Sequence, residues 1–388
     1  MICVYEDEGF RRLSPLVDVR PVFDLRCGRF TLLEKLQRLY PNQKFNLWVR
    51  DELAELTAEV HPGYRVNQPV KKGGLFLSGR AILEAHIESE GREAVLLSGD
   101  DVVGFRFCAE HAVRISSLEG LKAAFAKEQV KAKVVKWPWD IVEYNAEEIE
   151  KELKNQRQKS GVRNQSGVVL VGPRNRLIIA PGARVWPGTV INTETGSVMV
   201  DRNAQVRPGS FIEGPCYIGP RTVIDAARVR PGCSFGPHCR VGGEVEASVF
   251  QGYANKHHDG FIGHSFVGEW ANLGALTTNS DLKNAYQPVR VFFDGKAVDT
   301  GLLKVGCFIG DHAKTAIGTL LNTGARVGTF ANWFEPGLSP REIPAFAWGQ
   351  EQRWKLSDAL VCAQAVMARR GIRMTSAYER VLRRLHGR

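Results

Sequence analysis

A six-residue period runs through the second half of the chain and constrains its fold more than any other feature. A helix places apolar residues every three or four positions and a half-buried strand every second, so neither element explains this spacing. Hexapeptide periodicity is typical of a parallel β-helix, whose stacked coils bury an apolar stripe that no coil buries alone. The anchors fall at Ile179, Val185, Ile191, Val200, Val206, Ile212, Ile218, Ile224, Val229, Phe235 and Val241, then at Phe261, Val267 and Leu273, and again at Ile309, Thr315, Leu321 and Val327.

The length of 388 residues suggests two domains and a tail, because a domain commonly holds about 100 to 200 residues. With 44% hydrophobic and 24% charged residues, the composition is typical of a soluble globular protein. The chain lacks an apolar run long enough to span a membrane, and its first residues lack the features of a signal peptide, which predicts a cytoplasmic protein. The eight cysteines show no paired spacing, so we expect buried, reduced thiols.

The formal net charge of +10 indicates anionic partners. No basic stretch is interleaved with aromatic residues, which argues against nucleic acid binding. Nucleotides, sugar phosphates and coenzyme A are the favoured partners. A basic cluster near the C-terminus is expected to be a solvated helix face, and it comprises Arg369, Arg370, Arg373, Arg380, Arg383, Arg384 and Arg388.

Residues 1–142 alternate strand-like and helical patterns, which predicts an α/β domain with a mainly parallel sheet. The strand-like runs are MICVY, FNLWVR, GLFLSG and AVLLSGDDVVGFRF, and the helical ones are TLLEKLQRLY and RAILEAHIESE. Because such sheets bind ligands at the carboxyl ends of their strands, the loop after the first strand is a candidate ligand site.

Residues 143–166 are predicted to form a linker, with a helix capped by Asn145 and then a flexible stretch, SGVRNQSG. The β-helix would occupy residues 167–338. Residues 339–388 would form a helical tail, interrupted at Gly371, that covers its open end. Within the β-helix, residues 280–304 break the period, and Asp294-Gly295 predicts a hairpin turn. This insertion would carry function or pack against a neighbouring subunit.

Polar side chains gather where the period breaks before its second block. They are Lys256, His257, His258, Asp259, His264, Asn279 and Lys283. Imidazole can accept a proton from an amine at neutral pH, which favours a general base among the histidines. A metal site is an alternative, although the spacing of these ligand types matches no common zinc pattern. Surface histidines without a role are another.

The hexapeptide blocks, the segments NKHHDGFIGH and VGEWANLGALTTNSDLKN, and the front segment LSPLVDVRPVFDLRCG together resemble the GlmU-type family of bifunctional nucleotidyltransferase/acetyltransferases, in particular its divergent bacterial branch. The resemblance covers nearly the whole chain. It implies an N-terminal Rossmann-like domain and a left-handed β-helix that forms a homotrimer. It also implies acetyl transfer from acetyl-CoA to glucosamine 1-phosphate, and Mg²⁺-dependent transfer from UTP to the sugar phosphate.

The resemblance assigns a role to individual residues of the β-helix. His258, three residues before FIG, corresponds to the catalytic base of the family. Arg230, in VRPG, would bind the sugar phosphate, and guanidinium suits this role because it can grip two phosphate oxygens at once. Asn279 would contact the sugar or orient the nucleophile. Ala275, in LGAL, and Asp311, in IGDH, would lie near acetyl-CoA.

Two departures concern the acetyl-transfer site. Phe261 stands where the family has a tyrosine, so a hydroxyl contact to the phosphate is lost. The lysine that the family places upstream has no counterpart near Glu246 to Ser248. Lys256 or Lys283 would have to supply that charge, and the identity of the amino sugar stays open.

The N-terminal domain departs further from the family. A phosphate-cradling loop needs glycines so that backbone N–H groups can approach the phosphates, and this chain offers Gly9 alone before its first arginines. Side chains would then grip the nucleotide instead, and the candidates are Arg12, Arg20 and Arg26. These could equally pair with Asp18 and Asp24.

The metal ligand of nucleotidyl transfer would be Asp100 or Asp101, in LLSGDD. If LFLSGR aligns at that position instead, Arg80 replaces the aspartate and the Mg²⁺ ligand is lost. We therefore expect an acyltransferase with a second, nucleotidyl-transfer activity. The alternatives are a nucleotidyltransferase whose β-helix only assembles or regulates subunits, and a catalytically silent binding protein.

Overall fold

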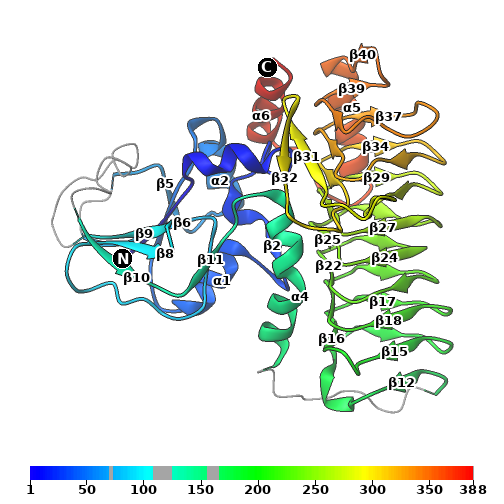
Figure 1. Cartoon of the computed structure of the whole chain (residues 1–388), viewed down its shortest axis with the longest axis horizontal. Helices are drawn as coiled ribbons and strands as arrows, with labels where there is room; N and C mark the ends of the chain where they lie inside the picture. The colour runs from blue at the N-terminus through cyan, green and yellow to red at the C-terminus, as the bar shows by residue number, and fades with distance from the viewer. Residues whose placement is uncertain (70–72, 108–124, 155–165, 388) are drawn as a thin grey trace.

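The computed structural model describes residues 1–69, 73–107, 125–154 and 166–387, and it sets an α/β domain beside a long β-helix (Figure 1). The predicted fold class, an α/β domain followed by a left-handed parallel β-helix and C-terminal helices, is confirmed. The helices are α1 (Leu32–Leu39), α2 (Ala54–Val60), α4 (Pro138–Lys154), α5 (Leu356–Ala368) and α6 (Ser376–His386). In the described ranges, none of the helices is long and apolar enough to cross a membrane.

A seven-stranded sheet forms the centre of the N-terminal domain, in the order β10, β8, β9, β6, β1, β4, β5. Its strands are β1 (Ile2–Tyr5), β4 (Phe45–Trp48), β5 (Arg65–Val66), β6 (Gly74–Ser78), β8 (Ala94–Ser98), β9 (Asp101–Phe107) and β10 (Ala126–Gln129). Only β9 among them runs antiparallel to its neighbours, so the expectation of a mainly parallel sheet is confirmed. The carboxyl ends of β1, β6 and β8 therefore lie at the same edge of the sheet.

The predicted helix over RAILEAHIESE is wrong. Ala81–Leu83 forms strand β7, which pairs antiparallel with β11 (Ala132–Val134). Further along the segment, the hydroxyl of Tyr40 bonds both backbone groups of Ile87. These tertiary contacts satisfy backbone groups that a helix would pair internally, and so they override the local preference for a helix.

The predicted linker helix exists, but its capping residue was misassigned. Helix α4 begins at Pro138, where the side chain of Asp140 accepts hydrogen bonds from the backbone N–H groups of Lys136 and Trp137. Proline suits the first turn because its missing N–H would have no helical partner there. Asn145 is not the N-cap, since it lies buried inside the helix. Most of the stretch SGVRNQSG lies outside the described residues.

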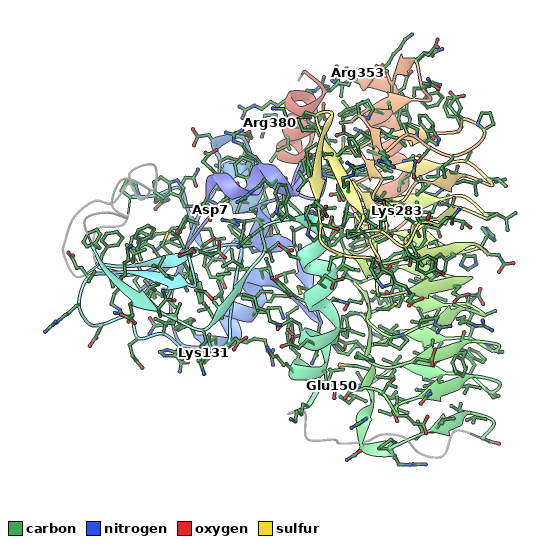
Figure 2. All side chains as sticks on the ribbon, viewed as in Figure 1. Asp7, Lys131, Glu150, Lys283, Arg353 and Arg380 are labelled. Carbon is green, nitrogen blue, oxygen red and sulfur yellow. The ribbon has the colours of Figure 1, made fainter. Side chains whose placement is uncertain are left out.

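Helix α4 stands between the two domains and joins them (Figure 1). The amide of Asn145 accepts from the N–H of Gly28 and donates to the carbonyl of Gly232, which belongs to the β-helix. Five residues further along the helix, Glu150 (Figure 2) bonds the N–H and hydroxyl of Ser197. The helix is thus an internal bridge whose polar contacts fix the β-helix against the N-terminal domain.

Each coil of the β-helix passes through three parallel faces in turn. The first face holds β12 (Val169–Val171), β15 (Val190–Asn192), β18 (Phe211–Glu213), β21 (Arg228–Val229), β24 (Glu244–Glu246) and β27 (Phe261–Gly263). The second holds β13 (Leu177–Ile179), β16 (Val198–Val200), β19 (Cys216–Ile218), β22 (Cys233–Phe235), β25 (Val249–Phe250), β28 (Phe266–Val267), β33 (Phe308–Ile309), β36 (Arg326–Val327) and β38 (Glu342–Ile343). The third holds β14 (Arg184–Val185), β17 (Gln205–Val206), β20 (Val223–Ile224), β23 (Arg240–Val241), β26 (Asn255–Lys256), β29 (Asn272–Leu273), β34 (Lys314–Thr315), β37 (Asn332–Trp333), β39 (Ala347–Trp348) and the antiparallel β40 (Gln352–Arg353).

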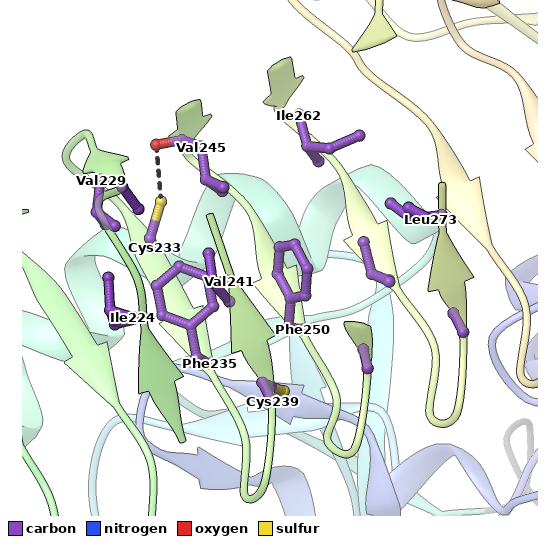
Figure 3. Packing of buried hydrophobic residues seen from close by; sticks show 14 of the residues in the cluster. Ile224, Val229, Cys233, Phe235, Cys239, Val241, Val245, Phe250, Ile262 and Leu273 are labelled. Carbon is purple, nitrogen blue, oxygen red and sulfur yellow. Dashed lines mark hydrogen bonds between the residues drawn. The ribbon is translucent and has the colours of Figure 1, made fainter. Parts of the chain in front are cut away.

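The hexapeptide anchors fill the interior of these coils (Figure 3). Ile224 and Val241 occupy matching register positions on successive coils, and the rings of Phe235 and Phe250 lie 5.2 Å apart. Burial of each such side chain contributes about 1.5 to 3 kcal/mol, so the stacked columns stabilise the β-helix collectively. Six cysteines of the described residues are buried and Cys362 is half-buried; all seven are free, as predicted. Cys108 lies outside those residues.

The predicted hairpin in the insertion is confirmed. Strand β31 (Arg290–Phe293) pairs antiparallel with β32 (Lys296–Asp299). The turn between them has positive φ at both Asp294 and Gly295, a conformation that Asp-Gly favours. Phe293 lies 5.2 Å from the ring of Trp137, so the hairpin packs against the N-terminal side of the same chain.

The two predicted C-terminal helices are present, and Gly371 follows α5 with a positive φ. They pack along the side of the β-helix rather than across its end. Apolar residues of α5 and α6 share one cluster with the N-terminal sheet and with Phe330 and Phe346 of the β-helix. Arg380 of α6 also pairs with Glu55 of α2. The tail therefore ties the two domains together.

A column of stacked rings occupies one corner of successive coils. His312 lies within it, 4.4 Å from the ring of Phe330 and 6.1 Å from that of Trp270. It is completely buried, and neither ring nitrogen has a hydrogen-bond partner among the described residues. Burial lowers the pKa of His312 well below its usual value, and the positive charges of Lys314 and Arg20 lower it further.

We expect His312 to make the protein sensitive to acid. Because its pKa is lower in the folded protein than the value of about 6.5 in the unfolded chain, unfolding takes up a proton below that pH. The free energy of unfolding is therefore not reduced by His312 above about pH 6.5. Below that pH it falls by up to about 1.4 kcal/mol per pH unit. His312→Phe keeps a ring in the column and should reduce this loss. Urea unfolding at pH 7.5 and 5.5 measures it, with the exposed His86→Phe as control.

Candidate active site

The histidine-containing segment of residues 257–260 forms the corner between β26 on the third face and β27 on the first. A surface groove of about 550 Å³ runs past this corner and the equivalent corners of neighbouring coils. It is lined by Gly209, Phe211, Ala226, Ala227, Arg228, Gly243, Glu244, Asp259, Gly260, Phe261 and Thr278. Stacked corners therefore create an open trough along the side of the β-helix.

His258 lies exposed next to Asp259, which lines the groove. Its ring lies edge to face with that of His257, with centroids 5.2 Å apart. Nε2 of His257 lies 3.3 Å from a carboxylate oxygen of Asp225, and burial lowers the pKa of His257. Of the two histidines, His258 is thus the more accessible to a ligand at this corner.

Arg230 lies on the same side of the β-helix as the groove. Its guanidinium lies 3.8 Å from Glu244 and 4.0 Å from Glu213, which are on the coils above and below. Its side chain is 42% exposed, and Nε has no hydrogen-bond partner among the described residues. The charge of Arg230 is therefore held beside a groove-lining carboxylate and stays open to an anion.

Asn279 is buried beneath the groove. Its amide accepts from the N–H of Gly263 and donates to the carbonyl groups of Gly263 and Ser280. These contacts complete the ladder where the insertion displaces the next coil. Its neighbour Thr278 lines the groove. Lys283 is in the insertion, where its ammonium donates to the carbonyl of Pro288 (Figure 2).

Ala275 and Asp311 lie at different corners of the β-helix. Ala275 follows the third face, and its carbonyl accepts from the N–H of Gly318 on the next coil. Asp311 lies between the second and third faces, at the interface with the N-terminal domain. Its carboxylate bonds Arg20 and accepts from the N–H of Glu269. Both contacts turn Asp311 away from the groove.

The three arginines predicted to bind nucleotide are not brought together. Arg12 is exposed and lies 5.2 Å from the ring of Trp137. Arg20 is buried against Asp311 and Glu269 of the β-helix. The backbone N–H of Arg26 donates to the side chain of Gln251, also in the β-helix. The loop after β1 thus serves as an interface between the domains.

The expected nucleotide site at the carboxyl edge of β1 and β6 contains an ion pair. The guanidinium of Arg80 contacts both carboxylate oxygens of Asp7, at 2.7 and 3.0 Å, and donates to the carbonyl of Val135. Ser78 and the N–H of Gly9 also bond that carboxylate. A Cβ on Gly9 would lie 2.4 Å from the guanidinium carbon, so glycine is required for this close approach. Arg80 therefore lies directly against the loop after β1, at Asp7 and Gly9.

The residues present do not fit a Mg²⁺ ion. Asp7 is neutralised by Arg80, and Asp101 pairs with Lys136 at 2.6 Å. Asp100 is exposed at the turn between β8 and β9. Nowhere in the described ranges do three His, Cys, Asp or Glu side chains form a group that could hold a metal ion. That finding includes the candidate ligands His257, His258, Asp259 and His264.

Two features of this geometry were not predicted from the sequence. The carboxylate of Glu244 lines the groove, and its position next to Gly243 at a coil corner could have indicated this. The pairing of Asp7 with Arg80 had no local signal, because the two residues are 73 positions apart. Their proximity follows from the parallel pairing of β1 with β6.

Comparison with known proteins gives independent support for the family. Residues 2–160 match the model of a family described as sugar nucleotidyl transferase. This match covers less than half of the chain and lies over its N-terminal domain. A bifunctional sugar-1-phosphate nucleotidylyltransferase/acetyltransferase from Sulfurisphaera tokodaii is 30% identical over 160 residues, which cover 38% of each protein.

Two further relatives share the transferase names. A bifunctional protein GlmU from Jannaschia sp. is 33% identical over 147 residues, covering 35% of this chain and 31% of the relative. An uncharacterized acetyltransferase, YaiX, from Escherichia coli is 29% identical over 166 residues, covering 42% of this chain and 72% of the relative. The predicted resemblance to the GlmU-type family is confirmed, although the chain spans only 38% and 31% of the first two relatives.

Proposed function

We propose that the protein transfers an acetyl group from acetyl-CoA to the amine of glucosamine 1-phosphate, or of a related amino-sugar 1-phosphate. The single observation that carries this proposal is the groove beside His258, whose charges complement such a substrate. Arg228 suits a phosphate, and Glu244 and Asp259 suit an ammonium group. The similarity to proteins named as acetyltransferases favours the same reaction.

In the proposed reaction, His258 acts as the general base. The amine nitrogen attacks the thioester carbonyl carbon and forms the new C–N bond, while the imidazole takes the proton that the nitrogen loses. The tetrahedral intermediate then breaks its C–S bond, and the imidazolium returns the proton to the departing thiolate. Four residues remain proposed determinants of sugar-phosphate binding, either by direct contact or by shaping the wall of the groove. They are Arg230, Lys256, Lys283 and Asn279. Ala275 remains a candidate for contact with acetyl-CoA, whereas Asp311 is buried against Arg20 and is no longer proposed for that role.

Incubation with acetyl-CoA and amino-sugar phosphates tests the proposal. Free thiol, followed with a thiol-reactive dye, should appear together with an equal amount of N-acetylated sugar phosphate. Glucosamine 6-phosphate and N-acetylglucosamine 1-phosphate serve as controls, since the first moves the phosphate and the second lacks a free amine. Absence of thiol release with every amino-sugar phosphate would refute the acyltransferase proposal and favour a β-helix that only assembles subunits.

Nucleotidyl transfer is the second candidate function, favoured by the family match over residues 2–160. It would join a nucleoside monophosphate from UTP or another triphosphate to the sugar 1-phosphate. Because Arg80 neutralises Asp7 and Lys136 pairs with Asp101, we expect no Mg²⁺-dependent activity.

Pyrophosphate release measures the second function directly. The wild-type protein with each of the four common nucleoside triphosphates, Mg²⁺ and N-acetylglucosamine 1-phosphate should release no more pyrophosphate than the same mixture with EDTA. Mg²⁺-dependent release that requires the sugar phosphate would contradict this expectation. It would mean that the Asp7–Arg80 pair opens when the nucleotide binds.

A homotrimer is the proposed assembly. Apolar side chains of the β-helix are exposed on neighbouring coils, and another copy of the chain would cover them. Leu276 is 55% exposed, Ile317 79%, Leu320 45% and Leu338 59%. The bridge between Leu320 and Leu338 sets two of them side by side.

A further inference from the structure

Lys256 occupies an inward position of the β-helix where the neighbouring coils have aliphatic residues. Its partner in the register on β23 is Val241, and the inward residue on the next coil is Leu273. The residue is 2% exposed. A buried lysine is costly unless its ammonium finds polar partners, so this position requires an explanation other than packing.

The ammonium of Lys256 reaches the wall of the groove. Nζ donates to the backbone carbonyl of His258 at 2.5 Å. A Cβ built on Gly243 would lie 2.8 Å from the same nitrogen, so the ammonium lies directly against this groove-lining glycine. The apolar stem thus completes the interior column, and the charged end holds the corner that carries the imidazole.

Burial lowers the pKa of Lys256 to about 8, against the opposing effect of the Asp259 carboxylate. The strands on either side present the apolar Val241 and Leu273 to its stem, and the titratable neighbours on its own segment are His257, His258 and Asp259. At neutral pH the ammonium is therefore mostly charged, and it loses its proton under mildly alkaline conditions.

We propose that Lys256 is a positioning residue for acetyl transfer, which fixes the His258 corner against the groove through the carbonyl of His258. The inference rests on the proposed function. The role differs from direct contact with the sugar phosphate, because Lys256 acts through the backbone next to the base. A misplaced catalytic group lowers the rate strongly, since the reacting atoms must meet in a narrow range of geometries.

Lys256→Met tests the role, because methionine keeps most of the stem and removes the ammonium. We expect kcat for acetyl transfer to fall about 10- to 100-fold, with a smaller change in KM for the sugar phosphate. Lys314→Met is the matched control. The ammonium of Lys314 also donates to a backbone carbonyl two residues away, that of His312, at 3.0 Å. It lies over the ring of Trp354, however, and does not line the groove. This control should keep the wild-type kcat.

The pH profile gives a readout that a purely structural role would not change. Wild-type kcat should decline as the pH rises through about 8, where Lys256 loses its proton, and this decline should be absent from the residual activity of Lys256→Met. An unchanged kcat in the variant would overturn the inference. If the variant fails to fold, the wild-type protein alone decides: a kcat that does not decline above about pH 8 would also overturn the inference. An inactive wild-type protein would instead refute the proposed function itself.

Discussion

Replacing His258 with alanine is expected to lower kcat for acetyl transfer by about 10²- to 10⁴-fold, the range that a general base contributes. The loss should appear in kcat more than in KM, because the imidazole acts on a proton that moves during the reaction. His258 is exposed, so its removal should change the free energy of unfolding by no more than about 0.5 kcal/mol. Initial rates of thiol release and urea unfolding curves measure the two quantities.

His257→Ala is the matched control for this experiment. It removes an imidazole from the same corner, but one that lies 3.3 Å from Asp225 and whose pKa is lowered by burial. The control should keep most of the wild-type rate. A His258→Ala protein with full activity would show that another group, or the solvent, accepts the proton. An equal loss in both variants would mean that the shape of the corner, rather than one base, limits the rate.

The regular part of the fold could be predicted because the residues there follow a pattern that is visible over a few positions of the sequence. Inward anchors recur about every six residues because the faces of the β-helix are short and similar in length, as at Ile212, Ile218 and Ile224. The hairpin of the insertion was readable from Asp294-Gly295, since few residue pairs adopt two successive positive φ angles. The inward position of Lys256 follows from the same register and could have been read from it.

The contacts between the domains could not be predicted in this way. Arg20 and Asp311 are 291 residues apart, and their charges give no sign of which partner each will find. The resemblance to the family assigned Arg20 to nucleotide and Asp311 to the acyl carrier, whereas in this chain the two side chains bind each other. The same holds for Asp7 and Arg80, whose pairing depends on the order of strands in the sheet. Local sequence patterns predict secondary-structure elements, whereas the partner of each charged side chain depends on how those elements pack together.

Replacing Arg20 with methionine is expected to destabilise the protein by about 3 to 5 kcal/mol at pH 7.5, because it leaves a buried carboxylate without its counter-charge. The guanidinium lies between Asp311 and Glu269, and its side chain is 10% exposed against 2% for Asp311. Burial and the Glu269 carboxylate already raise the pKa of Asp311 above its usual value, against the opposing effect of Arg20. Without Arg20 the pKa should rise further. Urea unfolding followed by tryptophan fluorescence gives the free energy.

The pH dependence of that loss separates the charge from the packing. A carboxyl group whose pKa is raised on folding gains stability as the pH falls through the folded value, because the folded state then binds the proton more tightly. The deficit in the free energy of unfolding of Arg20→Met relative to wild type should therefore become smaller when the pH is lowered from 7.5 to 5.5.

Asp311→Asn in the same background should recover part of the stability, since the amide oxygen can still accept from the N–H of Glu269. The exposed Arg12→Met is the control and should change stability by no more than about 0.5 kcal/mol. A deficit of equal size at both pH values would show that Arg20 stabilises the interface through its stem rather than its charge.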